Sequence, residues 1–312
     1  GGAPASLQAS AVVLENHSGA IRAMIGGRRF GHSEFNRATQ SRRPMGSVFK
    51  PLVYGAAFER GLFPGMAVSD AAIAPGEIEW DRSGWSPQNA DGVYGGMLPV
   101  ETGLIQSRNT MTVRVGEHAG IGTVLAMMEH AGLGEAERAG PTPPLYIGTV
   151  GANVRDVTSA YSVFATGGIR HRPFYIESIA DLDGTVLYQH EDANYRVLSP
   201  GAAWLTSKLL QKAVAEGGTG AGLRQMGFTA PAGGKTGTTN DYEDAWFVGY
   251  ASRLSGGVWI GLDQPAKIMD GAYGGRIAVP VWHDLMTAAA RIGYEFENLI
   301  DPGEVVSMEL CR

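Results

Sequence analysis

Ser47 and Lys50 stand three residues apart in the stretch 46–51 (GSVFKP). Apolar residues follow at helical spacing between positions 49 and 57, which predicts a helix buried on one face, and Gly61 ends the pattern. Side chains three apart on a helix share a face, so the Lys50 amine can reach the Ser47 hydroxyl. The spacing therefore indicates a nucleophile beside its base, the arrangement that covalent catalysis uses.

A serine hydroxyl becomes an effective nucleophile only when a base removes its proton, and a lysine at its ordinary pKa of about 10.4 is protonated. The pKa of Lys50 therefore has to fall. Desolvation, the positive end of the helix dipole and a second cation all disfavour the ammonium form. Lys235 is the candidate for that second cation, because lysine is rare in this chain and Lys235 opens a Lys-Thr-Gly motif.

A Ser-x-Asn motif, Ser107 and Asn109, lies between the two lysines. Helical periodicity on both sides of it, at 99–105 and 110–118, predicts that it lies on a short connection between helices. Each motif alone has a structural explanation; Ser47, for example, could simply cap a helix. The chance expectation of Ser-x-x-Lys, Ser-x-Asn and Lys-Thr-Gly in this order is roughly 0.001 for this composition, so the set favours catalysis.

The third motif belongs to a predicted strand at 233–238. Thr236 and Thr238 lie two apart on it, so their hydroxyls share a face and can bind a carboxylate. Such a strand at the edge of a sheet can also hold an extended peptide by strand addition. Backbone N–H groups at Ser47 and Thr238 can form an oxyanion hole. For Trp246, on the following strand, a place in the core is the better explanation, with substrate stacking as an alternative.

Composition restricts the class of protein. A chain of 312 residues with 44% hydrophobic content can bury a large core, and its net charge of −6 argues against a nucleic-acid partner. No apolar run approaches the ~18 residues that a membrane helix needs. The single cysteine, Cys311, excludes an internal disulfide and a cysteine-based zinc site, and the seven histidines include no metal-binding spacing. We expect no cofactor and no metal.

The order of predicted elements indicates an α+β fold. Strands are expected at 11–15 and 20–25, helices through the middle of the chain, and an antiparallel meander followed by a last helix at 279–292. A long irregular connection is expected at 61–96, and Pro51 should loosen the first turn of the Ser47 helix. The chain is expected to form one domain, with an α/β lobe at about 7–60 and 225–295 and a mostly helical lobe at about 61–224.

These motifs resemble the transpeptidase domain of bifunctional (class A) penicillin-binding proteins. The likeness includes 35–39 (FNRAT), 235–241 (KTGTTND) and 244–249 (DAWFVG), and it extends from about residue 7 to residue 292. It implies a penicillin-binding/β-lactamase-like fold, in which helices flank an antiparallel sheet and a helical subdomain is inserted between the two halves of the sheet.

The resemblance also implies a D,D-transpeptidase that cross-links peptidoglycan and is acylated by β-lactams. In that family pattern Ser47 attacks the D-Ala–D-Ala carbonyl, Lys50 is its base, Ser107 relays a proton to the leaving amine and Asn109 binds the substrate amide. The terminal carboxylate is anchored by the remaining motif residues, which are Lys235, Thr236, Gly237 and Thr238.

The partners implied are stem peptides, as donor and as amine acceptor, and β-lactam antibiotics. Family members act at the periplasmic, extracytoplasmic face of the inner membrane, and they carry a membrane anchor and a glycosyltransferase domain. Both are expected to be absent from this chain, whose full-length form is expected to be membrane-anchored and part of a cell-wall synthesis complex. For the basic stretch 28–43, a solvated loop is the favoured explanation and binding of an anionic cell-wall polymer the alternative.

Two alternative functions share the acylation chemistry. A D,D-carboxypeptidase or a β-lactamase passes the acyl group to water, and class A β-lactamases support that water with a glutamate four residues before an asparagine. Neither Asn153 nor Asn194 follows a glutamate at that spacing, so this pattern is absent between Asn109 and Lys235. A non-catalytic β-lactam sensor is the second alternative.

Overall fold

The structure is a computed structural model that describes residues 6–78, 80–81, 83–134 and 140–308. Cys311, the single cysteine on which the prediction of no internal disulfide was based, lies outside the described residues. None of the helices in these ranges is long and apolar enough to cross a bilayer.

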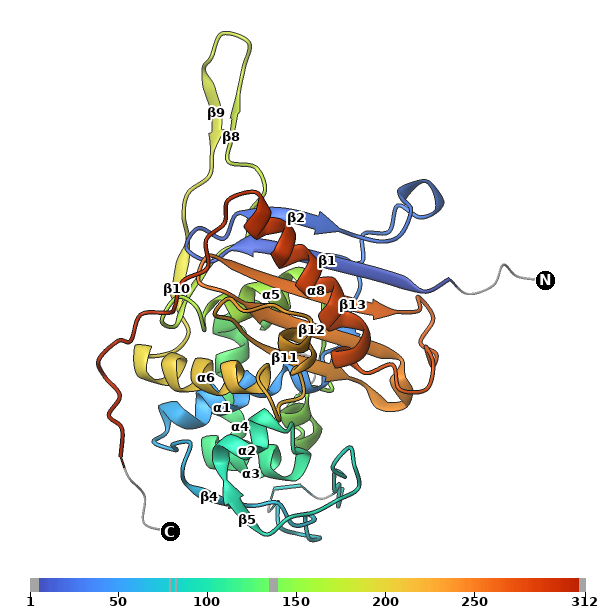
Figure 1. The fold of residues 1–312 in the computed structure, drawn as a ribbon, viewed down its shortest axis with the longest axis vertical. Helices are drawn as coiled ribbons and strands as arrows, with labels where there is room; N and C mark the ends of the chain where they lie inside the picture. The colour runs from blue at the N-terminus through green and yellow to red at the C-terminus, as the bar shows by residue number, and fades with distance from the viewer. Residues whose placement is uncertain (1–5, 79, 82, 135–139, 309–312) are drawn as a thin grey trace, which may run out of the picture.

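A five-stranded antiparallel sheet forms the centre of the molecule (Figure 1). Its strands lie in the order β11 Gly233–Thr238, β12 Asp244–Tyr250, β13 Leu254–Gly261, β1 Gln8–Glu15 and β2 Ile21–Ile25. Strand β1 pairs with β13 along its whole length, so segments from opposite ends of the sequence lie side by side. This confirms the predicted α+β fold, with a helical segment inserted between two halves of one sheet.

The described α-helices are α1 Lys50–Glu59, α2 Val100–Ile105, α3 Asn109–Ala119, α4 Ile121–Met128, α5 Val154–Ser162, α6 Pro200–Ala213, α7 Gly222–Gln225 and α8 Gly274–Arg291. Short strands form two-stranded ladders: β3 Arg43–Pro44 with β6 Gly151–Ala152, β4 Ala67–Ser69 with β5 Met97–Pro99, β7 Ile169–His171 with β10 Asn194–Arg196, and β8 Ser178–Ala180 with β9 Val186–Gln189. The 3-10 turns are η1 Phe30–His32, η2 Gly46–Val48, η5 Pro143–Ile147 and η6 Asn240–Tyr242, and η3 Glu129–Leu133 is a π-helical turn.

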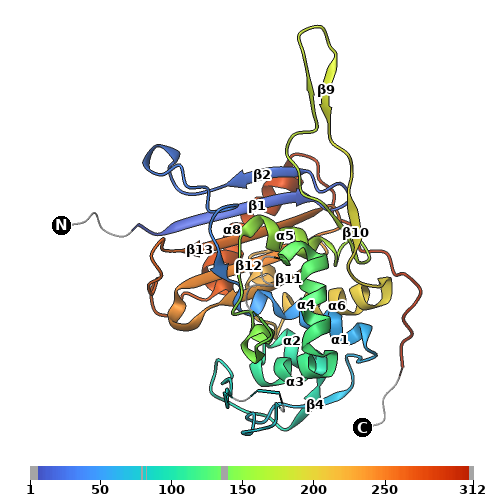
Figure 2. The same ribbon diagram turned by 180° about the vertical axis from the view of Figure 1, so that it is seen from behind.

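Helices cover both faces of the sheet. Helix α8 lies across one face, against β12 and β13, with Trp282 and Met286 fully buried (Figure 1). Helix α5 covers the other face, against β13 and β1 (Figure 2). Trp246 and Phe247 of β12 are both buried in the core, as expected.

Helix α8 begins at Gly274, five residues before the predicted start at 279. A side chain at Gly274 would place its Cβ 2.1 Å from the Trp246 carbonyl oxygen, so a glycine is needed for the helix to approach the sheet. The Gly274 N–H donates to the Thr238 hydroxyl, which links the start of α8 to the end of β11.

Helix α1 is buried on all sides, whereas the sequence predicted one buried face. The residues from Lys50 to Phe58 are all buried, because α1 lies among α3, α4 and α6. The pattern of apolar residues could not reveal this, since several of its small residues, such as Gly55 and Ala56, fit either environment.

The described residues of the connection at 61–96 are irregular apart from β4, as predicted. Strands β8 and β9 form a hairpin around Gly184, and it projects from the body of the molecule at the top of Figure 1.

The turn that carries Ser47 is held from two directions. Ladder β3–β6 precedes it, and the Gly46 N–H donates to the Gly148 carbonyl at 2.8 Å. Gly148 has φ +83°, and a Cβ there would lie 2.0 Å from the Gly46 carbonyl oxygen. The backbones of these two segments are therefore in direct contact.

We predict that Gly148→Ala lowers the free energy of unfolding by about 2–5 kcal/mol, because it adds a clash with Gly46 to the cost of a positive φ. Gly167→Ala is the matched control: its φ is +64° but no atom lies within 4 Å of the added Cβ. That variant should lose only about 1–2 kcal/mol in urea denaturation. Equal losses in the two variants would contradict the proposed packing.

Candidate active site

Ser47 lies half-buried on the 3-10 turn η2, immediately before α1. Pro51 is in the first turn of α1, directly after the 3-10 turn η2, and the loosening expected there stays a prediction. The Tyr161 hydroxyl donates to the Val48 carbonyl at 2.6 Å and fixes the turn to α5. Ser47 is thus held by its backbone neighbours.

The Lys50 amine is fully buried and hydrogen-bonds to the Ser-x-Asn motif. Its Nζ lies 2.7 Å from the Ser107 carbonyl oxygen, 2.7 Å from Asn109 Oδ1 and 3.2 Å from Ser107 Oγ. The sequence predicted that this amine reaches the Ser47 hydroxyl, but no hydrogen bond joins the two within the described chain. The reason is that Ser47 precedes α1 on a separate turn, while the amine is directed toward the connection between α2 and α3.

The Ser-x-Asn motif occupies that connection, as predicted. Ser107 has φ +60°, an unusual conformation for a residue other than glycine. Arg108, the residue between Ser107 and Asn109, is held by the buried carboxylate of Asp70 at 2.8 Å and by Asp91 at 2.6 Å. Through these ion pairs, the irregular segment at 61–96 anchors the strained turn at Ser107.

Two further residues of that segment support Asn109. Asn89 Oδ1 accepts the Asn109 backbone N–H at 2.7 Å, and the Gln88 carbonyl accepts from the Asn109 side chain at 2.7 Å. The sequence analysis assigned no role to Asp70, Asn89 or Gln88. Nothing local marks them, because their partners are 19 to 40 residues away along the chain.

The Lys-Thr-Gly motif lies on β11, at the edge of the sheet, as predicted. Gly237 is the point of closest approach to the serine turn, since a Cβ there would lie 2.9 Å from both the Met45 carbonyl oxygen and Val48 Cγ1. A Cβ at Gly46 would likewise lie 3.1 Å from the Thr238 carbonyl oxygen. The structure therefore brings the first and third motifs together.

Thr219 is a residue that the sequence analysis missed. Its hydroxyl lies 2.8 Å from the Thr236 hydroxyl and 3.4 Å from Lys235 Nζ, and its side chain is exposed. The segment around it contains several glycines and was interpreted as a flexible loop. Instead its backbone bonds to Ile105, and it continues into α7. The only sequence signal was a hydroxyl residue between glycines, which is too common to be informative.

The electrostatics of the two lysines follow from their burial. Burial, and then the positive charges of Lys235 and Arg108, lower the pKa of Lys50 well below its ordinary value. Burial lowers the pKa of Lys235 to about 7. For Asp70 burial opposes ionisation, but hydrogen bonds from Arg108 and Thr110 outweigh it and hold its pKa below the ordinary value. The site thus combines two lysine amines that lose their protons easily with a carboxylate, Asp70, that stays ionised.

This fold and this arrangement of motifs define a serine acyltransferase type of site. The chain matches the family model for the penicillin binding protein transpeptidase domain over residues 9–287. It therefore belongs to the family of penicillin-binding protein transpeptidase domains, and the resemblance drawn from the motifs is confirmed.

Its relatives lie in the class A branch of that family. Penicillin-binding protein 1A of Neisseria gonorrhoeae is 37% identical over 96% of this chain, and that of Pseudomonas aeruginosa is 30% identical over 97%. The chain spans 38% and 42% of the length of these two proteins.

Solved structures agree. Penicillin-binding protein 1A from Haemophilus influenzae superposes with a TM-score of 0.85 at 28% identity, covering 95% of this chain and 49% of that one. The PonA1 protein from Mycobacterium tuberculosis in complex with penicillin V gives a TM-score of 0.82 at 26% identity, covering 97% and 82%.

We predict that Asp70→Asn lowers the free energy of unfolding by about 3–5 kcal/mol, because it leaves the buried guanidinium of Arg108 without its buried carboxylate partner. Asp91→Asn is the matched control, since Asp91 pairs with the same arginine but is half-exposed. It should cost less than about 1 kcal/mol. Urea denaturation of both variants tests this, and a larger loss for Asp91→Asn would contradict the assignment of Asp70 as the main support.

Proposed function

We propose that this chain is a serine D,D-transpeptidase domain that cross-links peptidoglycan stem peptides through an acyl-enzyme on Ser47. The observation that carries the proposal is the buried, low-pKa amine of Lys50, hydrogen-bonded to Ser107 and Asn109 beside the turn that bears Ser47. β-Lactams acylate the same serine in this proposal.

Lys50 acts as the base. A neutral amine has two N–H bonds and one lone pair. The two shortest contacts, to the Ser107 carbonyl and to Asn109 Oδ1, use both protons and leave the lone pair to accept one from a hydroxyl. Ser47 Oγ attacks the carbonyl carbon of the penultimate D-Ala, its proton passes to Lys50, and Ser107 relays a proton to the amine of the departing D-Ala as the C–N bond breaks.

The terminal carboxylate of the donor binds at β11. Lys235 supplies positive charge, and the hydroxyls of Thr236 and Thr219 lie beside it. Thr238 Oγ accepts the Gly274 N–H, so its own proton remains free to be donated to a carboxylate oxygen. Gly237 allows the serine turn to lie against this strand, and the N–H groups of Ser47 and Thr238 form the oxyanion hole.

The comparisons support the wider proposal. The two relatives are more than twice as long as this chain. The whole protein is proposed to carry a glycosyltransferase domain and a membrane anchor. It is proposed to work in a cell-wall synthesis complex at the periplasmic face of the inner membrane. Residues 1–312 form one transpeptidase domain in this proposal, with the α/β and helical lobes expected from the sequence. The structure of PonA1 with penicillin V supports β-lactam binding.

Hydrolysis is the second candidate function. A carboxypeptidase or β-lactamase needs a base for water near the acyl-enzyme. No carboxylate of the described chain hydrogen-bonds to Ser47 or Lys50, which favours transfer to an amine. Glu135 and Glu137, two of the glutamates between Asn109 and Lys235, lie outside the described residues.

We predict that labelled penicillin forms one long-lived adduct on Ser47, and that Ser47→Ala forms none while remaining folded by circular dichroism. With a D-Ala–D-Ala donor and a D-amino acid or stem-peptide amine, mass spectrometry should show more aminolysis than hydrolysis. An adduct on folded Ser47→Ala would show that Ser47 is not the nucleophile. Rapid turnover with no amine in the product would replace transpeptidation by the hydrolytic alternative, and a stable adduct with no turnover of the donor would indicate a sensor.

We also predict that the second-order rate constant of penicillin acylation falls as the pH rises through about 7, because Lys235 loses the charge that attracts the carboxylate. Lys235→Arg keeps its charge throughout this range, so its profile should lack the falling limb even if its rate is lower. Stopped-flow measurements between pH 6 and 9 test this. A wild-type profile that stays flat would refute a role for the charge of Lys235.

A further inference from the structure

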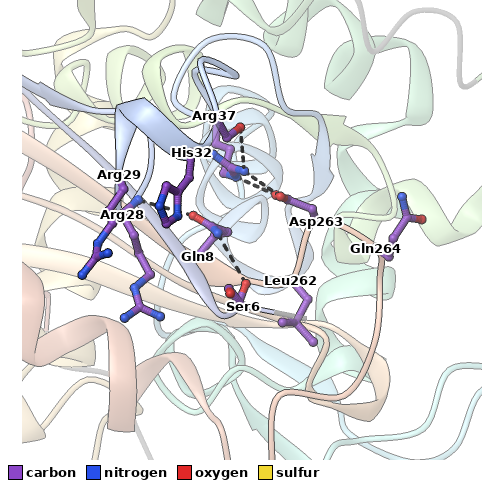
Figure 3. A pocket seen from close by; sticks show the side chains of 10 residues that line it. Ser6, Gln8, Arg28, Arg29, His32, Arg37, Leu262, Asp263 and Gln264 are labelled. Atoms are coloured by element: carbon purple, nitrogen blue, oxygen red, sulfur yellow. Dashed lines mark hydrogen bonds and ion pairs between the residues drawn. The ribbon is translucent and has the colours of Figure 1, made fainter. Parts of the chain in front are cut away.

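A cavity lies at the end of the central sheet, away from the serine turn. It has a volume of about 640 Å³ and lies between the loop after β2 and the segment after β13 (Figure 3). Nine of its ten lining residues are polar or charged, and Leu262 is the exception. The cavity is therefore suited to a hydrophilic ligand.

One ion pair holds the two walls of this cavity together. The Arg37 side chain is buried and its Nε and Nη2 atoms bind the two Asp263 carboxylate oxygens at 2.6 Å each. Arg37 Nη1 also donates to the carbonyls of Gly26 and Phe35. Asp263 is the one carboxylate among the lining residues, and Arg37 neutralises it.

The other cations of the cavity have no such partner. Arg28 and Arg29 are exposed, and neither side chain forms an ion pair or hydrogen bond within the described chain. They lie together on one side of the cavity in Figure 3, with His32 next to them. The chain as a whole carries a net charge of −6, so two adjacent unpaired arginines are a local excess of positive charge. Like charges held side by side repel, and a bound anion would relieve that repulsion.

We propose that this cavity binds a hydrophilic anion that carries two neighbouring negative charges on phosphate or carboxylate groups. The guanidinium fork of arginine binds both groups in a bidentate manner, and two forks match two charges. Gln8 and Ser33 supply further polar groups at the wall.

The ligand proposed for the cavity is hydrophilic, because Leu262 is the one apolar residue among those that line it. A separate apolar pocket of about 320 Å³ shares Leu262 with the cavity, but it is lined by Leu7, whereas the cavity is lined by Gln8.

The cavity is distinct from the proposed carboxylate site on β11. Gln8 pairs with Gly261, which pairs with Asp244 at the start of β12, next to the end of β11. Three inter-strand spacings separate Gln8 from β11, and together they amount to ~14 Å. An extended peptide of about four residues spans this distance, so stem-peptide carboxylates are one source of the anion, and free phosphate compounds are another.

Calorimetric titration at low salt tests the proposal with two probes, inorganic pyrophosphate and a stem-peptide fragment with free carboxylates. The wild-type chain should show saturable binding of at least one probe, and Arg28→Gln/Arg29→Gln should weaken that binding at least tenfold. The control Arg60→Gln/Arg291→Gln removes the same net charge from exposed positions outside the cavity and should change the affinity less than twofold. Preference for one probe identifies the source of the anion.

The proposal is wrong if neither probe binds saturably, or if the control variant loses as much affinity as the cavity variant. Penicillin labelling of Ser47 in Arg28→Gln/Arg29→Gln should proceed at the wild-type rate, which verifies folding. Because this labelling is independent of anion titration, failure of the anion site and failure of the proposed function are distinguishable.

Discussion

The structure depends on burying two lysines with no carboxylate partner. Lys50 and Lys235 are fully buried, and their hydrogen-bond partners in the described chain are neutral oxygen atoms. A buried ammonium without a counter-ion is costly, and the cost is relieved when the amine loses its proton. A carboxylate beside Lys50 would restore its charge and remove a base. The site is therefore organised to keep carboxylates away from this amine while holding hydroxyl and amide groups against it.

The ion pair between Asp70 and Arg108 also keeps negative charge away from Lys50. The buried carboxylate of Asp70 is fully engaged by Arg108, Thr110, Asn89 and the Gly95 N–H. Arg108 in turn adds positive charge near Lys50 and lowers its pKa further. The ion pair between Asp70 and Arg108 thus holds Ser107 in its positive-φ conformation. It also places the positive charge of Arg108, and not the negative charge of Asp70, toward the Lys50 amine.

Local sequence patterns predicted the sheet, most of the helices and the three motifs, because strand alternation, helical periodicity and turn residues act over short distances. They did not predict the contacts that place the motifs. Thr219 and Asp70 act through partners distant in sequence, and the close packing at Gly148, Gly237 and Gly274 has no local signal in the sequence. The prediction that the Lys50 amine can reach the Ser47 hydroxyl assumed one continuous helix, whereas the structure separates the two residues by a change from a 3-10 turn to α1.

Glycine packing explains why the serine turn is fixed without side-chain bonds to Ser47. The turn contacts Gly237 on one side and Gly148 on the other, and at both positions a Cβ would come within 3 Å of its backbone. Segments packed so closely that a Cβ does not fit leave the backbone little freedom, so the position of the serine turn is set before any substrate binds. Fixing a nucleophile in advance removes part of the entropic cost of reaching the transition state. Within the part of the chain that the structure describes, the Ser47 hydroxyl forms no hydrogen bond, so none has to be broken in the proposed attack.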